Sequence, residues 1–423
     1  MTIPAQPHPV TSTAQPHPVT IPAQPHPRHL VRNQGVTAAA GFKASGVAAG
    51  LKASGHLDVA LVVNEGPDHT AAGVFTRNQV KAAPVLWSQQ VLTTGRLRAV
   101  VLNSGGANAC TGPGGFQDTH ATAEHAAATL SGWGSATGAV EVAVCSTGLI
   151  GDRLPMDKLL PGVSEAVHEL AGGLVGGLDA ARAVMTTDSV PKQAAVQAGG
   201  FTVGGFAKGA GMLAPSLATM LVVLTTDAVA DASTLDTALR EACRTTFDRL
   251  DVDGATSTND TVLLLASGAS EHTPDLGELT AAVTAVCDDL AAQLMNDAEG
   301  ATKHVTITVS GARTEDEAVA VARTVARDSL VKTALFGSDP NWGRVLAAVG
   351  MAPVALEPDR IDVSFDGRPV CVGGVGAPGA REVDLSAERI SLEIALGLGA
   401  AAASIRTTDL SHGYVEENSA YSS

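Results

Sequence analysis

The stretch that decides the fold is Lys208-Gly-Ala-Gly-Met-Leu-Ala-Pro-Ser-Leu-Ala218-Thr219-Met-Leu-Val-Val-Leu224. Its second half is apolar and β-branched, which predicts a buried central strand. Its first half is rich in glycine and contains Pro215, so we expect a strained turn directly before that strand. A hydroxyl residue at the head of a buried strand can be held rigidly as a nucleophile. A threonine at a strand start can equally be structural, so the pattern alone leaves both interpretations open.

Strand and helix patterns alternate on both sides of this stretch. Val59–Val63 and Ala99–Leu102 predict buried strands, and Val305–Val309 alternates as a half-buried strand does. Thr314 and Glu317 form a capping box at the start of a predicted helix. Another helix is predicted by apolar residues that share one face, namely Leu279, Val283, Val286, Leu290 and Leu294. No linker-like composition interrupts the middle of the chain, so we expect one layered α/β body.

Composition excludes several classes of protein. The 423 residues carry a formal charge of −16, which disfavours binding to nucleic acid or to an anionic membrane surface. No apolar run is long enough to span a bilayer, and no signal core precedes the first basic residue, Arg28. The five cysteines are scattered without a C-x-x-C pair, which favours free thiols over disulfides or a zinc site. We therefore expect a soluble, cytoplasmic protein without a metal site.

Residues 1–27 differ from the rest of the chain. Ala-Gln-Pro-His-Pro occurs three times, at 5–9, 14–18 and 23–27. Such proline density removes backbone donors and favours extended chain over a packed core. We interpret this segment as a disordered tail, or as the product of a start codon assigned too far upstream. The alternatives are a docking peptide and a metal site built from His8, His17 and His26.

Several long motifs follow one another along the chain. They are, in order: Ala72-Gly-Val-Phe-Thr-Arg-Asn78 with Ala83-Pro-Val85, Asn103-Ser-Gly-Gly-Ala-Asn-Ala-Cys-Thr-Gly112, Cys145-Ser-Thr-Gly148, Met185-Thr-Thr-Asp188, Lys208-Gly-Ala-Gly-Met212, Ala218-Thr-Met-Leu221, Asp297-Ala-Glu-Gly300, Gly337-Ser-Asp-Pro-Asn-Trp-Gly-Arg344 and Asn418-Ser-Ala-Tyr-Ser-Ser423. These motifs resemble those of the glutamate N-acetyltransferase/ornithine acetyltransferase family of the cyclic arginine pathway, and the resemblance extends from about Val31 to Ser423. The departures are Gly106, where the family pattern has Asn, and the repetitive tail.

The resemblance implies that the chain cuts itself between Ala218 and Thr219. Residues 28–218 would then form an alpha chain and residues 219–423 a beta chain, assembled as two copies of each. Cleavage exposes the α-amine of Thr219, whose unperturbed pKa is about 7.7–8.0. A substantial fraction of such an amine is neutral at cytoplasmic pH and can take the proton of its own hydroxyl, which activates the nucleophile.

The resemblance also implies the rest of the site. Thr147 and Gly148 correspond to the oxyanion hole of the family, and its substrate-binding residues correspond to Thr186, Lys208, Thr219, Glu299, Asn418 and Ser423. Whether Thr186 or its neighbour Thr187 faces the substrate stays open, because adjacent residues on a strand face opposite sides. No partner histidine for Cys145 is evident, so this residue is interpreted as a small buried apolar residue.

The implied reaction is transfer of the acetyl group of N2-acetylornithine to glutamate through an acetyl-Thr219 intermediate, without a cofactor. The fold implied is a layered α/β sandwich of the ornithine acetyltransferase type. Some members also use acetyl-CoA as donor, and the sequence does not decide this point. The main alternative is a self-processing N-terminal-nucleophile amidase or peptidase, which would use water as acceptor. A scaffold role for the Pro-His repeat is a third hypothesis, under which deletion of residues 1–27 would abolish the function.

A nucleotide site is a further hypothesis, because Gly374-Val-Gly-Ala-Pro-Gly379 matches the G-x-G-x-x-G pattern. That motif needs a helix to begin at its last glycine, so that the helix amides face a pyrophosphate. The residues after Gly379 predict a loop and a strand instead, which argues against this site.

Overall fold

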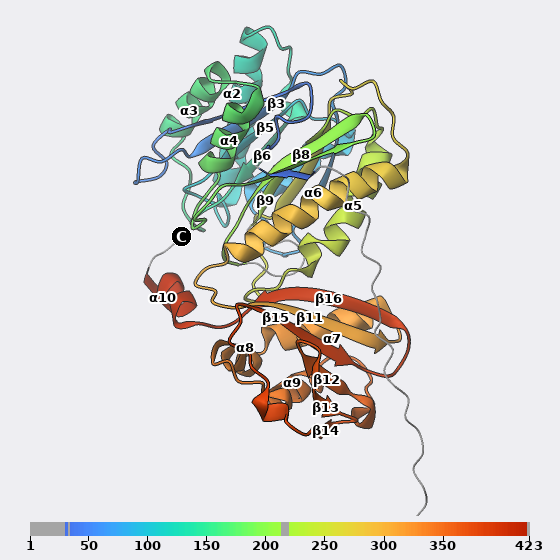
Figure 1. Cartoon of the computed structure of the whole chain (residues 1–423). Helices are drawn as coiled ribbons and strands as arrows, with labels where there is room; N and C mark the ends of the chain where they lie inside the picture. The colour runs from blue at the N-terminus through green and yellow to red at the C-terminus, as the bar shows by residue number, and fades with distance from the viewer. Residues whose placement is uncertain (1–29, 33, 213–219, 421–423) are drawn as a thin grey trace, which may run out of the picture.

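The computed structural model describes residues 30–32, 34–212 and 220–420, without the side chains of 30–32. Two lobes follow one another along the chain (Figure 1). The first lobe contains two sheets. One has four strands, in the order β2 (Phe42–Val47), β3 (Val59–Asn64), β5 (Ala99–Asn103) and β6 (Val142–Ser146).

The second sheet of this lobe has six strands, and the strand predicted from the deciding stretch lies inside it. The order is β1 (Leu30–Arg32), β7 (Lys192–Ala198), β8 (Phe201–Lys208), β9 (Leu221–Thr226), β10 (Thr261–Ala266) and β4 (Thr70–Phe75). Every residue of β9 and β10 is buried, and these two strands run parallel to each other. The prediction of a buried central strand is therefore confirmed.

Helices pack against both sheets of the first lobe. The four-stranded sheet contacts α1 (Ala83–Val91), α2 (Gly112–Gly132), α3 (Met156–His168) and α4 (Gly173–Ala183). The six-stranded sheet contacts α5 (Ala232–Thr245) and α6 (Leu276–Asn296). All five apolar positions predicted on the face of α6 are fully buried. The lobe is therefore a sandwich of four layers, with helices outside and sheets inside.

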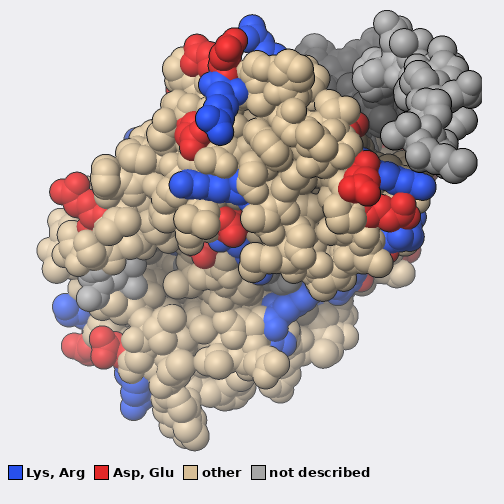
Figure 2. All heavy atoms as spheres, turned by 90° about the horizontal axis from the view of Figure 1, so that it is seen from below, with Lys and Arg blue, Asp and Glu red and all other residues tan. Residues whose placement is uncertain are grey.

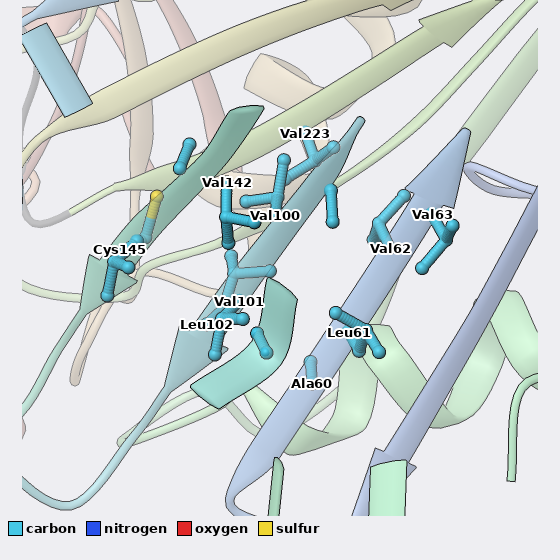
Figure 3. Packing of buried hydrophobic residues seen from close by; sticks show 14 of the residues in the cluster. Ala60, Leu61, Val62, Val63, Val100, Val101, Leu102, Val142, Cys145 and Val223 are labelled. Carbon is cyan, nitrogen blue, oxygen red and sulfur yellow. The ribbon is translucent and has the colours of Figure 1, made fainter. Parts of the chain in front are cut away.

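The core of the first lobe lies between its two sheets. Val62 and Val100 of the four-stranded sheet belong to the same apolar cluster as Val223 of β9 (Figure 3). Side chains alternate along β9, so that Val222 and Leu224 point instead into a second cluster, under α5 and α6. Because β9 contributes to both clusters, its first residues are held firmly from both sides.

The second lobe has its own sheet and its own apolar cluster. The strand order is β14 (Val375–Gly376), β13 (Arg368–Val372), β12 (Asp362–Phe365), β15 (Arg389–Ala395), β11 (His304–Ala312) and β16 (Ala401–Thr408). Its helices are α7 (Glu315–Arg327), α8 (Ser329–Phe336) and α9 (Trp342–Val349). The composition of the chain does not change at this boundary, so the prediction of one continuous layered body missed it.

The strand alternation and the helix start that the sequence predicts in the second lobe are confirmed. Val305, Ile307 and Val309 of β11 are buried while Thr306 is exposed, as alternation requires. The Thr314 side chain accepts a hydrogen bond from the Glu317 amide at 3.2 Å and begins α7. The residues after Gly379 form a three-residue 3₁₀ turn, so no α-helix begins at that glycine and the nucleotide motif lacks its structural context.

The face of the molecule drawn in Figure 2 carries charges of both signs. On the face drawn in Figure 2, lysine and arginine side chains lie among acidic ones, and uncharged surface covers most of the area. None of the helices in the described ranges combines the length and the apolar character needed to cross a bilayer.

The last helix, α10 (His412–Ala420), leaves the second lobe and returns toward the first (Figure 1). Its approach depends on Gly300, whose φ is +57° and whose position would place a Cβ 2.1 Å from the Tyr414 backbone nitrogen. The Ser411 hydroxyl donates a hydrogen bond to the carbonyl of the same glycine. A side chain at position 300 would therefore push α10 away.

Candidate active site

A pocket in the first lobe lies beside the ends of β6 and β8, the start of β9 and the helix α10. Six of the residues predicted for the site line it together, although they come from distant parts of the sequence: Thr147, Gly148, Thr186, Lys208, Glu299 and Asn418. Ala218, Thr219 and Ser423 lie outside the described residues. The structure thus brings together every predicted site residue that it describes.

Lys208, the last residue of β8, is the central cation of the pocket. Its ammonium Nζ donates hydrogen bonds to Thr147 Oγ1 at 3.1 Å and to Thr186 Oγ1 at 2.9 Å. The residue is only 2% exposed, and this burial lowers the pKa of the lysine, while the nearby carboxylate of Asp188 opposes the shift. Because Lys208 uses the oxygen lone pairs of Thr147, the hydroxyl hydrogen of that threonine remains available to another acceptor.

Thr147 and Gly148 follow β6 and form a tight bend. Gly148 has a φ of +126°, and a Cβ there would lie 2.6 Å from the Gly106 backbone nitrogen. The Gly106 amide itself donates to the Thr147 carbonyl at 3.0 Å, which holds the bend against the loop after β5. Among the described residues, none accepts a hydrogen bond from the Gly148 amide. This amide and the Thr147 hydroxyl are therefore two donors on adjacent residues that both line the pocket.

A buried ion-pair network holds the backbone at Thr186 and next to Lys208. The Lys192 ammonium lies 2.6 Å from Asp188 Oδ1 and 2.6 Å from Asp297 Oδ2, and its side chain is fully buried. Asp188 also accepts hydrogen bonds from the amides of Gly209, at 2.6 Å, and of Thr186, at 3.1 Å. Burial alone would raise the pKa of Asp188, but the two lysine cations and these amides lower it to about 2. The carboxylate is therefore ionised at neutral pH.

Glu299 and Asn418 also line the pocket, where they are in contact with each other. The Asn418 side-chain amide donates to Glu299 Oε2 at 2.9 Å and to the Tyr414 carbonyl at 3.0 Å. Glu299 is 8% exposed, and its backbone amide donates to the Ala210 carbonyl at 3.0 Å. The acid is thereby fixed against the loop that follows Lys208.

The entry to β9 lies beside these groups. Leu221 pairs with Lys208 on β8 and with Thr261 on β10. Met220, the residue that follows Thr219, is buried, and its amide donates to Asp260 Oδ1 at 3.0 Å. The chain therefore enters the sheet next to the pocket, directly after the predicted cleavage position.

The structure shows how Thr186 and Thr187 lie, and it adds one residue to the predicted site. Thr186 and Thr187 lie in an irregular loop after α4, and both line the pocket, so the argument that adjacent strand residues face opposite sides does not apply. Sequence reasoning also missed Asn259, which lines the pocket and donates to the carbonyls of Ala107 at 2.6 Å and Ser146 at 2.8 Å. The polar run before the apolar β10 was the signal that could have found it.

Cys145 is confirmed as a buried core residue. It is 3% exposed, and its sulfur lies among the apolar side chains of the first core (Figure 3). Burial raises the pKa of the thiol to about 12, so it is not a thiolate at neutral pH. Within the described residues, no group of three or more His, Cys, Asp and Glu side chains is arranged to hold a metal ion.

Comparison with known proteins agrees with the motifs. The model of the ArgJ family matches residues 43–423. The chain belongs to the ArgJ family. It is 74% identical over 395 residues to the arginine biosynthesis bifunctional protein ArgJ of Mycobacterium tuberculosis (strain ATCC 25618 / H37Rv), an alignment that covers 93% of this chain and 98% of the relative. The relative of the same name from Streptomyces coelicolor is 60% identical over 390 residues, covering 92% of this chain and 100% of the relative.

Solved structures include an ArgJ relative. The chain is similar to an ornithine acetyltransferase of Mycobacterium tuberculosis that was solved in complex with ornithine, with 76% identity and a TM-score of 0.43. That match covers 44% of this chain and 97% of the solved chain. The family resemblance inferred from the motifs is thus confirmed by the full-length ArgJ relatives.

Proposed function

We propose that this chain transfers the acetyl group of N2-acetylornithine to glutamate, with Thr219 as the residue that carries the acetyl group. The observation that carries the proposal is the position of Lys208, bonded to Thr147 and Thr186 and paired across the sheet with Leu221, two residues after Thr219. Membership of the ArgJ family supports the same reaction, as does the name of the relative solved with ornithine.

The first half-reaction begins at the amine of Thr219, which becomes a chain terminus once the bond after Ala218 is hydrolysed. This amine takes the proton of the Thr219 hydroxyl as the oxygen bonds to the acetyl carbonyl carbon. Negative charge then develops on the acetyl oxygen, where the Thr147 hydroxyl and the Gly148 amide can donate to it. The carbon–nitrogen bond breaks, the proton passes to the leaving α-nitrogen, and ornithine departs.

The second half-reaction reverses these steps with another amine. The α-amine of glutamate attacks the acetyl ester, its proton returns to the Thr219 oxygen through the same terminal amine, and N-acetylglutamate leaves. Because a bound acetyl ester must await its second substrate, ping-pong kinetics follow. The site also has to exclude water during that interval.

Charges in the pocket suit amino-acid substrates. The cation of Lys208 with the Thr186 hydroxyl can hold an α-carboxylate, and the Glu299 carboxylate can hold the side-chain ammonium of ornithine. A general amidase has no need for both charges at fixed positions, so they favour the transferase over the hydrolase. We place the reaction in the cytoplasm, and the family resemblance supports an assembly of two alpha and two beta chains.

The acceptor distinguishes the two enzyme hypotheses. Purified protein is incubated with N-acetylornithine, with and without glutamate, and ornithine and N-acetylglutamate are measured; acetyl-CoA is tested as a second donor. The transferase releases ornithine in catalytic amounts only when glutamate is present. Continuous release of ornithine and acetate without glutamate would identify an amidase instead.

A further inference from the structure

The carboxamide of Asn259 lines the pocket and joins two loops that are far apart in the sequence. The residue is only 3% exposed. Its Nδ2 atom donates to the Ser146 carbonyl at 2.8 Å and to the Ala107 carbonyl at 2.6 Å. Its Oδ1 atom accepts the Thr258 hydroxyl at 2.6 Å. Because a carbonyl can only accept, the nitrogen end of the carboxamide has to face the two loops.

The two loops also contact each other through their backbones. Gly106 and Thr147 form an isolated antiparallel bridge, in which the Gly106 amide donates to the Thr147 carbonyl at 3.0 Å. The Thr147 amide in turn donates to the Asn103 carbonyl at 2.9 Å, where the first loop begins. Asn259 comes from a third place, directly before β10, and donates to one carbonyl of each loop. It is therefore a clamp across the pair.

These contacts determine where the Gly148 amide points. The Thr147 carbonyl and the Gly148 N–H belong to one planar trans peptide, so they point in opposite directions. Since the carbonyl accepts the Gly106 amide, the N–H is directed away from the first loop. A shift of one loop against the other would turn this peptide, and the donor with it. The direction of the donor thus depends on the spacing that Asn259 spans.

We propose that Asn259 is a positioning residue for acetyl transfer. Its carboxamide holds the two loops at the spacing at which the Thr147 hydroxyl and the Gly148 amide can both donate to the acetyl oxygen. The inference rests on the proposed function, in which these two donors stabilise the negative charge on that oxygen. Asn259 acts before the charge develops, so that the donors need no reorganisation when it does.

The test compares the full-length wild-type protein with two variants of the clamp. Asn259→Ala removes the carboxamide, and Asn259→Asp keeps its shape but replaces the donor by an acceptor. Asn64→Ala is the matched control, because Asn64 is also fully buried and its Nδ2 atom donates to the carbonyls of Asp68 and Ala266, each at 3.0 Å. Asn64 does not line the pocket. Thermal melting and intact mass show whether each variant is folded and is cut as the wild type is.

Three measurements separate positioning of the donors from a general structural role. Rapid mixing with N-acetylornithine, without glutamate, gives the maximal rate of the first release of ornithine and the substrate concentration that gives half of this rate. Calorimetric titration gives the Kd for ornithine, which has no acetyl oxygen and cannot use the two donors. The first measurement is repeated on Gly148→Ala and on the double variant of Gly148→Ala with Asn259→Ala.

Asn259→Ala is expected to lower the maximal rate roughly 10- to 100-fold, because small misplacements are costly for groups that act in the transition state. Asn259→Asp should lose at least as much, since its carboxylate repels both carbonyls. The half-saturating concentration and the Kd for ornithine should stay within about threefold of the wild type. In the Gly148→Ala background, where the bend is already displaced, Asn259→Ala should cost less than about threefold, because changes that act through one element are not additive. Asn64→Ala keeps the wild-type rate.

A folded Asn259→Ala protein whose maximal rate is within about threefold of the wild type overturns the inference. So does an equal loss of rate with and without the Gly148→Ala change, or a loss of ornithine binding as large as the loss of rate. Clamp variants that both fail to fold, or that fold and stay uncut, also overturn it, since Asn259 would then serve the structure or its processing. Failure of the proposed function has a different signature, because the wild type itself would release no ornithine.

Discussion

The side-chain amide of Asn418 lies 2.9 Å from Oε2 of Glu299, across 119 positions of sequence. This bond places the C-terminal helix α10 at the wall of the pocket, where both residues are found. A chain end that is free to move does not usually contribute to a binding site. Here Gly300 and Ser411 hold the start of the helix, so its later residues can reach Glu299.

Asn418→Ala removes the donor to Glu299 and leaves the acid without its orienting partner. A hydrogen bond to a charged group contributes about 1.5–3 kcal/mol, so the KM for N-acetylornithine should rise roughly 10- to 100-fold. Steady-state kinetics give the value. Ser419→Ala in the same exposed stretch of α10 is the control and should keep the wild-type KM. Equal KM values for both variants would remove Asn418 from the site.

Lys208→Met removes the cation but keeps much of the apolar length of the side chain. The two threonines lose their common donor, and a bound carboxylate loses its counter-ion. We expect kcat/KM to fall at least about 100-fold, from the loss of a charge-assisted interaction in a buried site. Lys158→Met, at an exposed lysine on α3, should leave kcat/KM unchanged. If Lys208→Met retains one tenth of the activity, the cation does not hold substrate.

Gly148→Ala should damage catalysis more than binding. The added Cβ would meet the Gly106 nitrogen at 2.6 Å, and alanine rarely adopts a φ of +126°, so the bend must shift and the amide turns away from the oxyanion. Loss of one oxyanion donor typically lowers kcat by about 10²–10³. Rapid-quench measurement of acetylation gives the rate. An unaltered acetylation rate in a folded Gly148→Ala protein would show that this amide is not a donor.

Asp188 makes stability depend on pH in a defined direction. Its pKa is about 2 in the folded chain, against 3.8 for an ordinary aspartate, because the Lys208 and Lys192 cations outweigh the effect of burial. Above about pH 5 the carboxylate is ionised in both states and its stabilising effect is complete. As the pH falls from 4 toward 2, the unfolded chain binds the proton first, so about 2 kcal/mol of stability is lost.

Asp188→Asn lacks this titration. Urea unfolding at a series of pH values should therefore give the variant a clearly smaller free energy of unfolding than the wild type at pH 7. The difference between the two free energies should narrow by about 2 kcal/mol between pH 4 and pH 2. A difference in the free energy of unfolding that stays constant over this range would mean that Asp188 is not paired as described.

The sequence predicts much of the fold, because periodicity reports burial directly. The five apolar positions of α6 and the alternation of β11 are both found as expected. The boundary of the second lobe could not be predicted, since the same kinds of strand and helix continue across it. What separates the lobes is which apolar faces meet, and single-sequence patterns do not contain that information.

The motifs predict which residues form the site, but not which residues hydrogen-bond to them or form ion pairs beside them. Thr186, Lys208 and Glu299 stand in recognisable motifs, yet the network of Lys192 with Asp188 and Asp297 depends on the contact between β7 and the end of α6. Such contacts follow from tertiary packing.

The most direct test of the account is the intact mass of the purified protein under denaturing conditions, before and after addition of N-acetylornithine alone. The account predicts two chains, one of which begins Thr-Met-Leu-Val and gains the mass of one acetyl group on Thr219 when N-acetylornithine is added. Thr219→Ala should remain a single chain and gain nothing. A single uncut chain of 42.6 kDa in active wild-type protein, or an acetyl group on another residue, would contradict the account.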